Sequence, residues 1–219
     1  MTVTAVPGAP AWEADPYTDA LRSGCGPLFL HRVDGWLLPL EVERWCAAPD
    51  PADLTVLRRC RGAVLDIGCG PGRLVVALAA FGTAALGVDV SPEAVRRTRR
   101  SGGSALCRSV FDPLPGEGRW NTALLLDGNI GIGGDPAALL ARAAQLLAPD
   151  GQLFVEVSAL DVDERVEVRV ADGRGAFGSV FPWSRLGAAA LLRYARATGW
   201  RAAGRWTAAG RPFVALRRG

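Results

Sequence analysis

The chain has 219 residues, of which 49% are hydrophobic and 21% are charged, and its formal net charge is +3 at pH 7. A chain of this length and composition is typical of a globular domain that buries its core without disulfides or a structural metal. The small net charge requires neither a nucleic acid nor an anionic membrane as partner.

The cysteines and the apolar segments indicate which kinds of protein this chain is not. The five cysteines contain no C-x-x-C pair, so we expect neither a disulfide framework nor a bound metal. Reduced thiols indicate a cytoplasmic protein. We find no run of about 18 apolar residues, which argues against a membrane span. The segment Met1 to Pro10 does not resemble a signal peptide.

Residues 1–60 are predicted to be a mainly helical N-terminal extension that acts as a lid. Two prolines and a glycine make residues 1–11 a loosely ordered start. Asp15-Pro16 resembles an N-cap followed by proline at the first helical position. Further helices are expected around 36–45 and 54–62, where apolar residues recur at helical spacing.

Residues 61–219 are predicted to form the main domain, in which strands and helices alternate. This alternation predicts a parallel sheet that is covered by helices on both faces. The expected strands are 63–67, 84–90, 105–111, 122–126 and 152–157, and the expected helices are 74–80, 92–102 and 136–147.

The alternation stops after residue 160. The turn signal Asp172-Gly173 predicts an inserted hairpin at about 162–182, with strands at 166–170 and 176–181. A helix over 185–198 and two closing strands, 200–207 and 212–217, complete the predicted domain.

A glycine-rich loop follows the first predicted strand, in the segment Leu65 to Leu74. Gly68, Gly70 and Gly72 have the spacing G-x-G-x-G, whereas nicotinamide-binding proteins use G-x-G-x-x-G. Glycines let the backbone approach a ligand closely, and the next helix offers free N–H groups. The loop therefore predicts a nucleotide-like ligand.

An acidic residue ends the second predicted strand. Asp89 lies 89 − 68 = 21 residues after Gly68, where a carboxylate can accept hydrogen bonds from ribose hydroxyls. Ser91-Pro92-Glu93 then gives a strong helix start. The loop, the acid and the capped helix together indicate a nucleoside site.

These segments resemble the signature loops of class I S-adenosylmethionine-dependent methyltransferases. The resemblance covers roughly residues 60–160 and rests on Leu65 to Gly72 and Gly87 to Pro92. It implies a Rossmann-like α/β fold with a seven-stranded, mostly parallel sheet whose last strand is antiparallel. It also implies S-adenosyl-L-methionine as cofactor, with its amino group at Asp66 and its ribose at Asp89.

The resemblance also implies which other residues contact the cofactor. The methionine part would lie on the glycine loop, and the adenine near the end of the third strand. There, either Asp112 or Ser109 occupies the family's acidic position, and Phe111 would pack on the base. The full expected set is Asp66, Gly68, Cys69, Gly70, Gly72, Asp89, Val90, Ser109, Val110, Phe111, Asp112 and Asp127.

Three residues are candidates for catalysis. Asp127 and Asn129 lie in a glycine-rich loop after the fourth predicted strand, where such sheets bind ligands. That loop can instead be a plain connection in which Asp127 caps local amides. His31, the one histidine, is a natural general base, although a lone histidine in an extension is more often structural. Cys69 is expected to serve packing.

The function we expect is methyl transfer to a small-molecule acceptor, in bacterial secondary metabolism. The chain has no added RNA-binding module, and nucleic acid is not the expected partner. The alternatives are a cyclase or decarboxylase that retains the cofactor, an RNA or protein methyltransferase, a binding module, and a nicotinamide oxidoreductase. The inserted hairpin could serve as a lid or as the contact of a homodimer.

Overall fold

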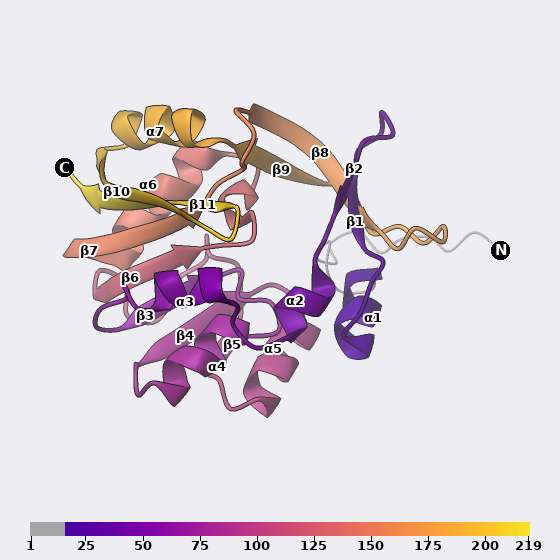
Figure 1. Ribbon diagram of the computed structural model, residues 1–219, viewed down its shortest axis with the longest axis horizontal. Coiled ribbons are helices and arrows are strands. Elements are labelled where there is room, and N and C mark those ends of the chain that lie inside the picture. The colour runs from indigo at the N-terminus through magenta and orange to yellow at the C-terminus, as the bar shows by residue number, and fades with distance from the viewer. Residues whose placement is uncertain (1–15) are drawn as a thin grey trace.

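A seven-stranded sheet forms the centre of the computed structural model, which describes residues 16–219 (Figure 1). The predictions for residues 1–11 and for Asp15 lie outside the described residues. The strands, in their order across the sheet, are β10 Trp200–Ala208, β11 Arg211–Arg218, β7 Leu147–Glu156, β6 Trp120–Leu125, β3 Val64–Ile67, β4 Ala85–Asp89 and β5 Ala105–Cys107.

The strand directions confirm the predicted Rossmann-like sheet. Strands β7, β6, β3, β4 and β5 are parallel, and β11 runs antiparallel to both β7 and β10. The third predicted strand is shorter than expected, because it ends at Cys107. Parallel strands put all their carboxyl ends at one edge of the sheet, which is where ligands bind in such folds.

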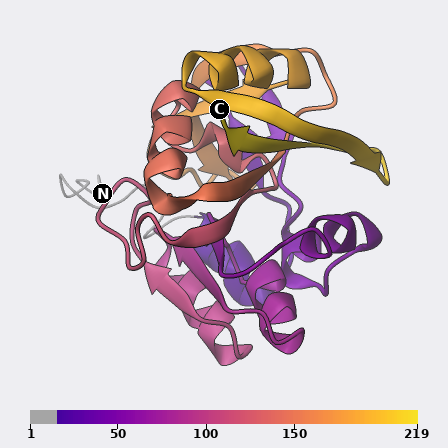
Figure 2. The same ribbon diagram turned by 90° about the vertical axis from the view of Figure 1, so that its left-hand side faces the viewer.

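Helices cover both faces of the sheet (Figure 2). One face carries α3 Pro51–Leu57, α4 Arg73–Ala80 and α5 Pro92–Arg100, and the other carries α6 Pro136–Leu146 and α7 Ala188–Ala197. The Ser91 hydroxyl accepts a hydrogen bond from the N–H of Ala94 at 3.3 Å, which confirms the predicted start of α5. No helix within residues 16–219 is long and apolar enough to cross a membrane.

A second, smaller sheet corrects the prediction for the N-terminal extension. Its order is β2-β1-β8-β9, with β1 Phe29–His31, β2 Leu37–Pro39, β8 Asp163–Ala171 and β9 Phe181–Leu186. The expected helix around 36–45 is wrong in its first half, since Leu37–Pro39 is a strand. Only α2 Val42–Cys46 is helical there. The helical periodicity was misleading because β1 finds its partner, β8, more than a hundred residues later.

The inserted hairpin also differs from its prediction. Its second strand lies at Phe181–Leu186 instead of 176–181, and Val168 pairs with Phe181. Asp172-Gly173 is therefore part of a longer connection between β8 and β9. The helix α1 Pro16–Ser23 packs against α5 and β8. A division of the chain into domains at residue 60 stays a prediction.

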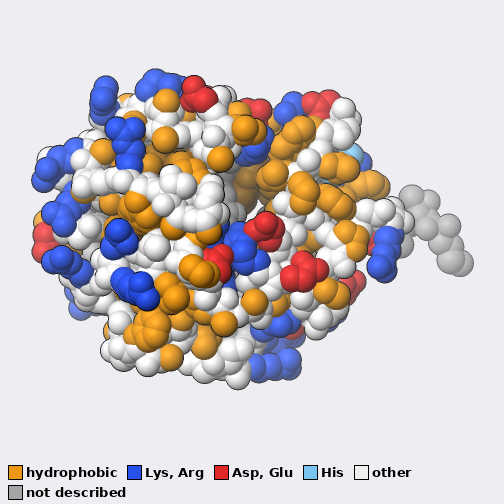
Figure 3. Space-filling model, viewed as in Figure 1, with side chains coloured by type: hydrophobic (Ala, Val, Ile, Leu, Met, Phe, Trp, Pro, Cys, Tyr) orange, Lys and Arg blue, Asp and Glu red, His pale blue; other side chains and the backbone are white. Residues whose placement is uncertain are grey.

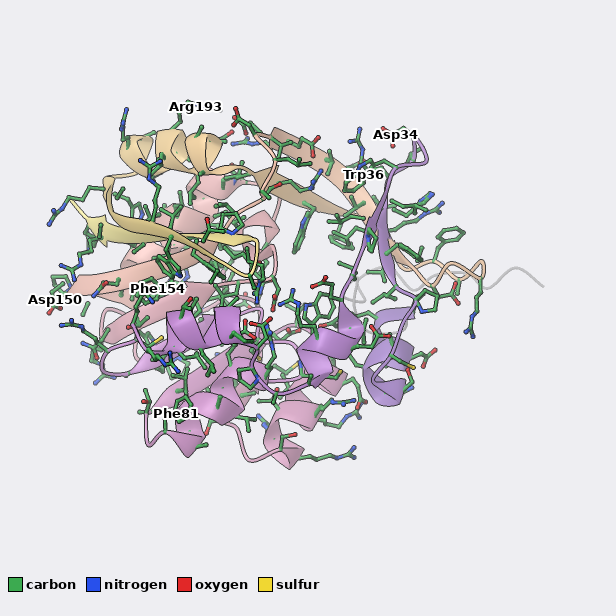
Figure 4. The ribbon with its side chains drawn as sticks, in the orientation of Figure 1. Asp34, Trp36, Phe81, Asp150, Phe154 and Arg193 are labelled. Carbon is green, nitrogen blue, oxygen red and sulfur yellow. The ribbon has the colours of Figure 1, made fainter. Side chains whose placement is uncertain are left out.

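The substitution Phe154→Ala tests the core between the sheet and α3. Phe154 is 1% exposed, and its ring packs edge-on against Trp206 at 5.9 Å between ring centroids. We expect Phe154→Ala to lower the free energy of unfolding by about 3–5 kcal/mol, measured by urea denaturation. Phe81, which is 62% exposed, is the matched control (Figure 4). We expect Phe81→Ala to change the free energy of unfolding by less than about 0.5 kcal/mol. Equal losses in the two variants would contradict this view of the core.

Candidate functional site

A pocket of about 350 Å³ lies at the carboxyl ends of β3, β4 and β6. Its floor is the loop after β3, and its roof consists of side chains from α1, α2 and the small sheet. Figure 3 shows the surface hollowed between the seven-stranded body and the small sheet. The roof side chains are Tyr17, Leu30, Leu40, Trp45, Phe181 and Trp183.

The glycine loop turns sharply beneath this pocket. The N–H groups of Gly68 and Cys69 both donate to the carbonyl of Val88, at 2.8 and 3.1 Å. Gly68 has a φ of +74°, and a Cβ on it would lie 2.6 Å from Nδ2 of Asn129. Only glycine fits this position, and the exposed backbone of Gly68 and Gly70 lines the pocket as expected.

Gly72 does not line the pocket, which corrects its predicted role in cofactor binding. Its φ is +88°, and a Cβ there would lie 2.5 Å from the side chain of Thr98. Thr98 also donates from its hydroxyl to the carbonyl of Gly70 at 3.0 Å. Gly72 therefore allows the start of α4 to pack closely on α5, which is a structural role.

Asp66 contributes a buried carboxylate to the floor of the pocket. Its side chain lines the pocket, and its Oδ2 has no hydrogen-bond partner within residues 16–219. Burial, together with the nearby Asp127 carboxylate, raises the pKa of Asp66 to about 7. An unsatisfied buried acceptor of this kind favours a cationic or hydrogen-bond-donating ligand. The ammonium group of S-adenosylmethionine fits this requirement.

Asp89 lies at the end of β4, beside the glycine loop. Its Oδ2 accepts from the N–H of Gly70 at 2.9 Å, and its Oδ1 accepts from the N–H of Ser91 at 2.8 Å. Burial raises the pKa of Asp89, although these backbone hydrogen bonds act against that shift. Val90 also lines the pocket. The carboxylate is thus held at the pocket wall, where ribose hydroxyls could donate to it.

The pocket lining distinguishes between Ser109 and Asp112, the two residues predicted for the adenine site. Ser109, Val110 and Phe111 line the pocket, whereas Asp112 does not. The side chain of Asp112 is exposed, and its backbone carbonyl accepts from Arg142 at 2.7 Å. The prediction for Asp112 is therefore corrected, because its strand ends early and the loop carries it past the pocket.

Asp127 lines the pocket but is held by three guanidinium groups. Its carboxylate pairs with Arg44 at 2.7 Å, Arg73 at 2.7 Å and Arg211 at 3.3 Å. The residue has a φ of +56°, so its backbone is held in an unusual conformation. Three ion pairs therefore hold the carboxylate in place. Its predicted catalytic role stays a prediction.

The charged network around Asp127 also includes Asp53 and Glu156. Asp53, which is fully buried, pairs with Arg73 and, at 2.9 Å, with Arg211. Arg211 also binds both carboxylate oxygens of Glu156, each at 2.7 Å. The sequence did not reveal this network, because its members are far apart in the chain and arginine is common throughout.

Asn129 lies in a short 3₁₀ helix, Asn129–Gly131, two residues after Asp127. Its Nδ2 donates to the carbonyls of Ile67 and Gly68, both at 2.9 Å. Asn129 lines the pocket as expected. Its amide group is bound to the glycine loop, and its predicted catalytic role stays a prediction.

His31 lies outside the pocket, so the structure does not support its predicted role as a base. Its imidazole contacts Phe177 at a tilt, with 5.5 Å between ring centroids, and its Nδ1 accepts from Nε of Arg169 at 3.3 Å. Both partners belong to the inserted segment. The histidine therefore joins β1 to that segment and serves structure.

The aromatic roof residues are functional candidates that the sequence analysis underestimated. Trp45, Phe181 and Trp183 line the pocket, and the Nε1 of Trp45 is buried without a partner in the described chain. Phe181 and Trp183 lie on β9, and neither was among the predicted site residues. No cluster of three potential metal ligands occurs within residues 16–219.

Two comparisons of the sequence point in the same direction as this geometry. A family model described as a methyltransferase domain matches residues 43–203. A ubiquinone biosynthesis O-methyltransferase from Xylella fastidiosa is 30% identical over 133 residues, which cover 56% of this chain and 54% of that protein. A release factor glutamine methyltransferase from Rhodospirillum rubrum is 33% identical over 154 residues, covering 53% and 47%. The chain spans about half the length of the curated relatives it matches.

Solved structures show the same fold. An S-adenosylmethionine-dependent methyltransferase from Bacteroides fragilis, in complex with S-adenosyl-L-homocysteine, matches with a TM-score of 0.79 and 22% identity. The match covers 93% of this chain and 94% of that one. The 1,6-didemethyltoxoflavin-N1-methyltransferase of Burkholderia thailandensis matches with a TM-score of 0.57 and 21% identity, covering 77% and 76%.

The pH dependence of stability tests the buried state of Asp66. In the folded chain without ligand the pKa of Asp66 is about 7, against an ordinary value of 3.8. Between these values the folded state keeps a proton that the unfolded state has lost. Stability therefore falls as pH rises from about 4 to about 7. The Asp66→Asn variant has no such group.

We expect the wild type to lose on the order of 2–4 kcal/mol relative to Asp66→Asn over this range. Urea denaturation of both proteins at several pH values between 4 and 8 measures the difference. Parallel curves for the two proteins would show that Asp66 is ionised in the folded state throughout.

Proposed function

Because this chain belongs to the family of S-adenosylmethionine-dependent methyltransferases, we propose that it methylates a small, largely apolar acceptor enclosed beneath the aromatic roof. The observation that carries this proposal is that one pocket is lined both by Asp66 and Asp89 and by the apolar side chains of the roof. One side of the pocket suits the cofactor, and the other suits an uncharged organic molecule.

The cofactor supplies an activated methyl group, whose positive sulfur makes it susceptible to in-line attack. In the proposed complex, Asp66 holds the amino group and Asp89 holds the ribose. Ser109 to Phe111 enclose the adenine. The backbone of Gly68 and Gly70 gives close access to the methionine part. These assignments rest on the pocket lining and on the unsatisfied Oδ2 of Asp66.

The acceptor side of the pocket is the reason for proposing a small organic molecule. Tyr17 and Trp45 contribute rings from α1 and α2, and Phe181 and Trp183 contribute rings from β9. Phe181 and Trp183 meet edge to face at 6.0 Å between ring centroids. Aromatic walls bury planar apolar molecules well. A pocket of about 350 Å³ does not enclose a macromolecule.

Proximity and exclusion of water would supply most of the catalysis. None of the pocket's aspartates is proposed as a base. In this proposal Asp66 and Asp89 bind the cofactor, and Asp127 is paired with three arginines. Burial raises the pKa of the Cys69 thiol, so it is not a base either. We therefore propose that the acceptor atom is already nucleophilic when it binds, and that the roof aligns it with the methyl–sulfur bond.

We also propose that the enzyme acts in the cytoplasm, because all five cysteines are free thiols. Whether it works as a homodimer stays a prediction.

Binding of S-adenosyl-L-homocysteine tests the cofactor assignment. Asp89→Ala removes the proposed acceptor for two ribose hydroxyls, and each such hydrogen bond to a charged group contributes about 1.5–3 kcal/mol. We expect a loss of affinity of at least about 100-fold in isothermal titration calorimetry. Asp112→Ala, at an exposed residue outside the pocket, is the control and should bind like the wild type. Wild-type affinity of Asp89→Ala would overturn the assignment.

Mass spectrometry of reaction mixtures tests the reaction class. Incubation with S-adenosylmethionine and a panel of small phenols, aromatic amines and thiols should yield a product one methylene heavier than its acceptor. A product that retains the acceptor's mass, or loses carbon dioxide, would identify a cyclase or a decarboxylase instead.

A further inference from the structure

A second hollow, of about 640 Å³, lies at the opposite end of the sheet from the pocket. It is bounded by the end of α3 and the loop after it, and by β7, β10 and β11. The pairing register locates it, since Arg201 lies opposite Arg217 and Arg217 lies opposite Gln152. Strand β7 ends at Glu156, and its carboxyl end lies at the pocket's edge of the sheet. Gln152 comes before that end. The hollow is thus separate from the proposed active site.

Arginine dominates the lining of this hollow, which we call the arginine hollow. Six of its lining residues are arginines, and none is acidic. All six are exposed. Basic side chains gather over this end of the molecule in Figure 3. The six residues are Arg58, Arg59, Arg61, Arg201, Arg205 and Arg217.

These arginines differ from those at the pocket end, where Arg44, Arg73 and Arg211 are all paired with carboxylates. The structure gives none of the six in the arginine hollow an ion pair within residues 16–219. Two of them make other contacts. Arg59 donates to the carbonyl of Thr55 at 2.5 Å, and Arg201 donates to the carbonyl of Arg218 at 3.4 Å. Six like charges without a paired carboxylate repel one another weakly through water, and a bound anion would relieve this repulsion.

Protection of an edge strand does not explain the whole cluster. Strand β10 is the edge of the sheet, and charged residues on such a strand discourage pairing with another chain. Protection of this edge explains Arg201 and Arg205, which lie on β10. It does not cover Arg58 and Arg61, which follow α3, or Arg217 on the interior strand β11.

We propose that the arginine hollow binds a ligand that carries several phosphate groups. The guanidinium group is planar and donates two parallel hydrogen bonds, which match the oxygens of a phosphate. The volume lies in the range of small-ligand sites. The aromatic ring in the lining, Trp206, is stacked on Phe213 at 5.3 Å and covered by Arg59 at 4.5 Å. It is therefore not open for base stacking, and recognition falls on the phosphates.

Calorimetric titration with inorganic tripolyphosphate at 150 mM salt (about physiological ionic strength) tests this proposal. We expect saturable binding of one tripolyphosphate per chain. The double variant Arg61→Ala with Arg217→Ala should weaken this binding at least about tenfold. The double variant Arg100→Ala with Arg119→Ala removes the same charge from exposed positions outside the hollow, and should leave binding unchanged.

Further arms distinguish the possible sources of phosphate. Duplex DNA can displace tripolyphosphate, and the double variant Arg61→Ala with Arg217→Ala can lose binding of both ligands. In that case the site accepts the phosphates of a nucleic-acid backbone. If duplex DNA does not compete, the ligand is a compact polyphosphate. Equal loss in both double variants, no binding, or equally tight binding of polyglutamate would overturn the proposal. S-adenosyl-L-homocysteine affinity, which should be the same in all variants, reports the active site separately.

Discussion

The buried ion network around Asp53, Arg73, Asp127 and Arg211 is the constraint on which the pocket depends. It ties α3, α4, the end of β6 and β11 together beside the glycine loop. Charges buried at such a point are costly unless every one is paired, and the loss of one partner leaves the others uncompensated. The network therefore fixes the loop after β6, where Asn129 in turn holds the carbonyls of the glycine loop. The shape of the cofactor site follows from these pairs.

The sequence predicted the central sheet well because its signals are local. A short apolar strand, the glycine loop and Asp89 lie within 30 residues of one another, and each has its own steric or capping reason. For the same reason, the sequence could place Asp66, Gly68, Gly70 and Asp89 around one pocket. Asp112 was misplaced because its strand ends early, and register within a loop cannot be read from residue types.

The roof was not predictable, because its strands depend on distant partners. Strands β1 and β2 have three residues each, and they are stable only when β8 completes their sheet. Before that partner is known, Trp36, Leu37 and Leu40 fit a helical period equally well. The same non-local origin hid the ion network, whose arginines could not be told apart from the many others in the chain.

The split origin of the small sheet has a consequence for how the chain matures on the ribosome. Strand β1 leaves the ribosome long before its partner β8, since about 130 residues separate them. The glycine loop, β4 and most of the parallel sheet are already synthesised by then. We expect the parallel strands β3 to β6 to pair first, while the apolar side chains of β1 still await burial. Premature termination after β7 would leave the pocket without β8 and β9 of its roof, and Asp127 without Arg211.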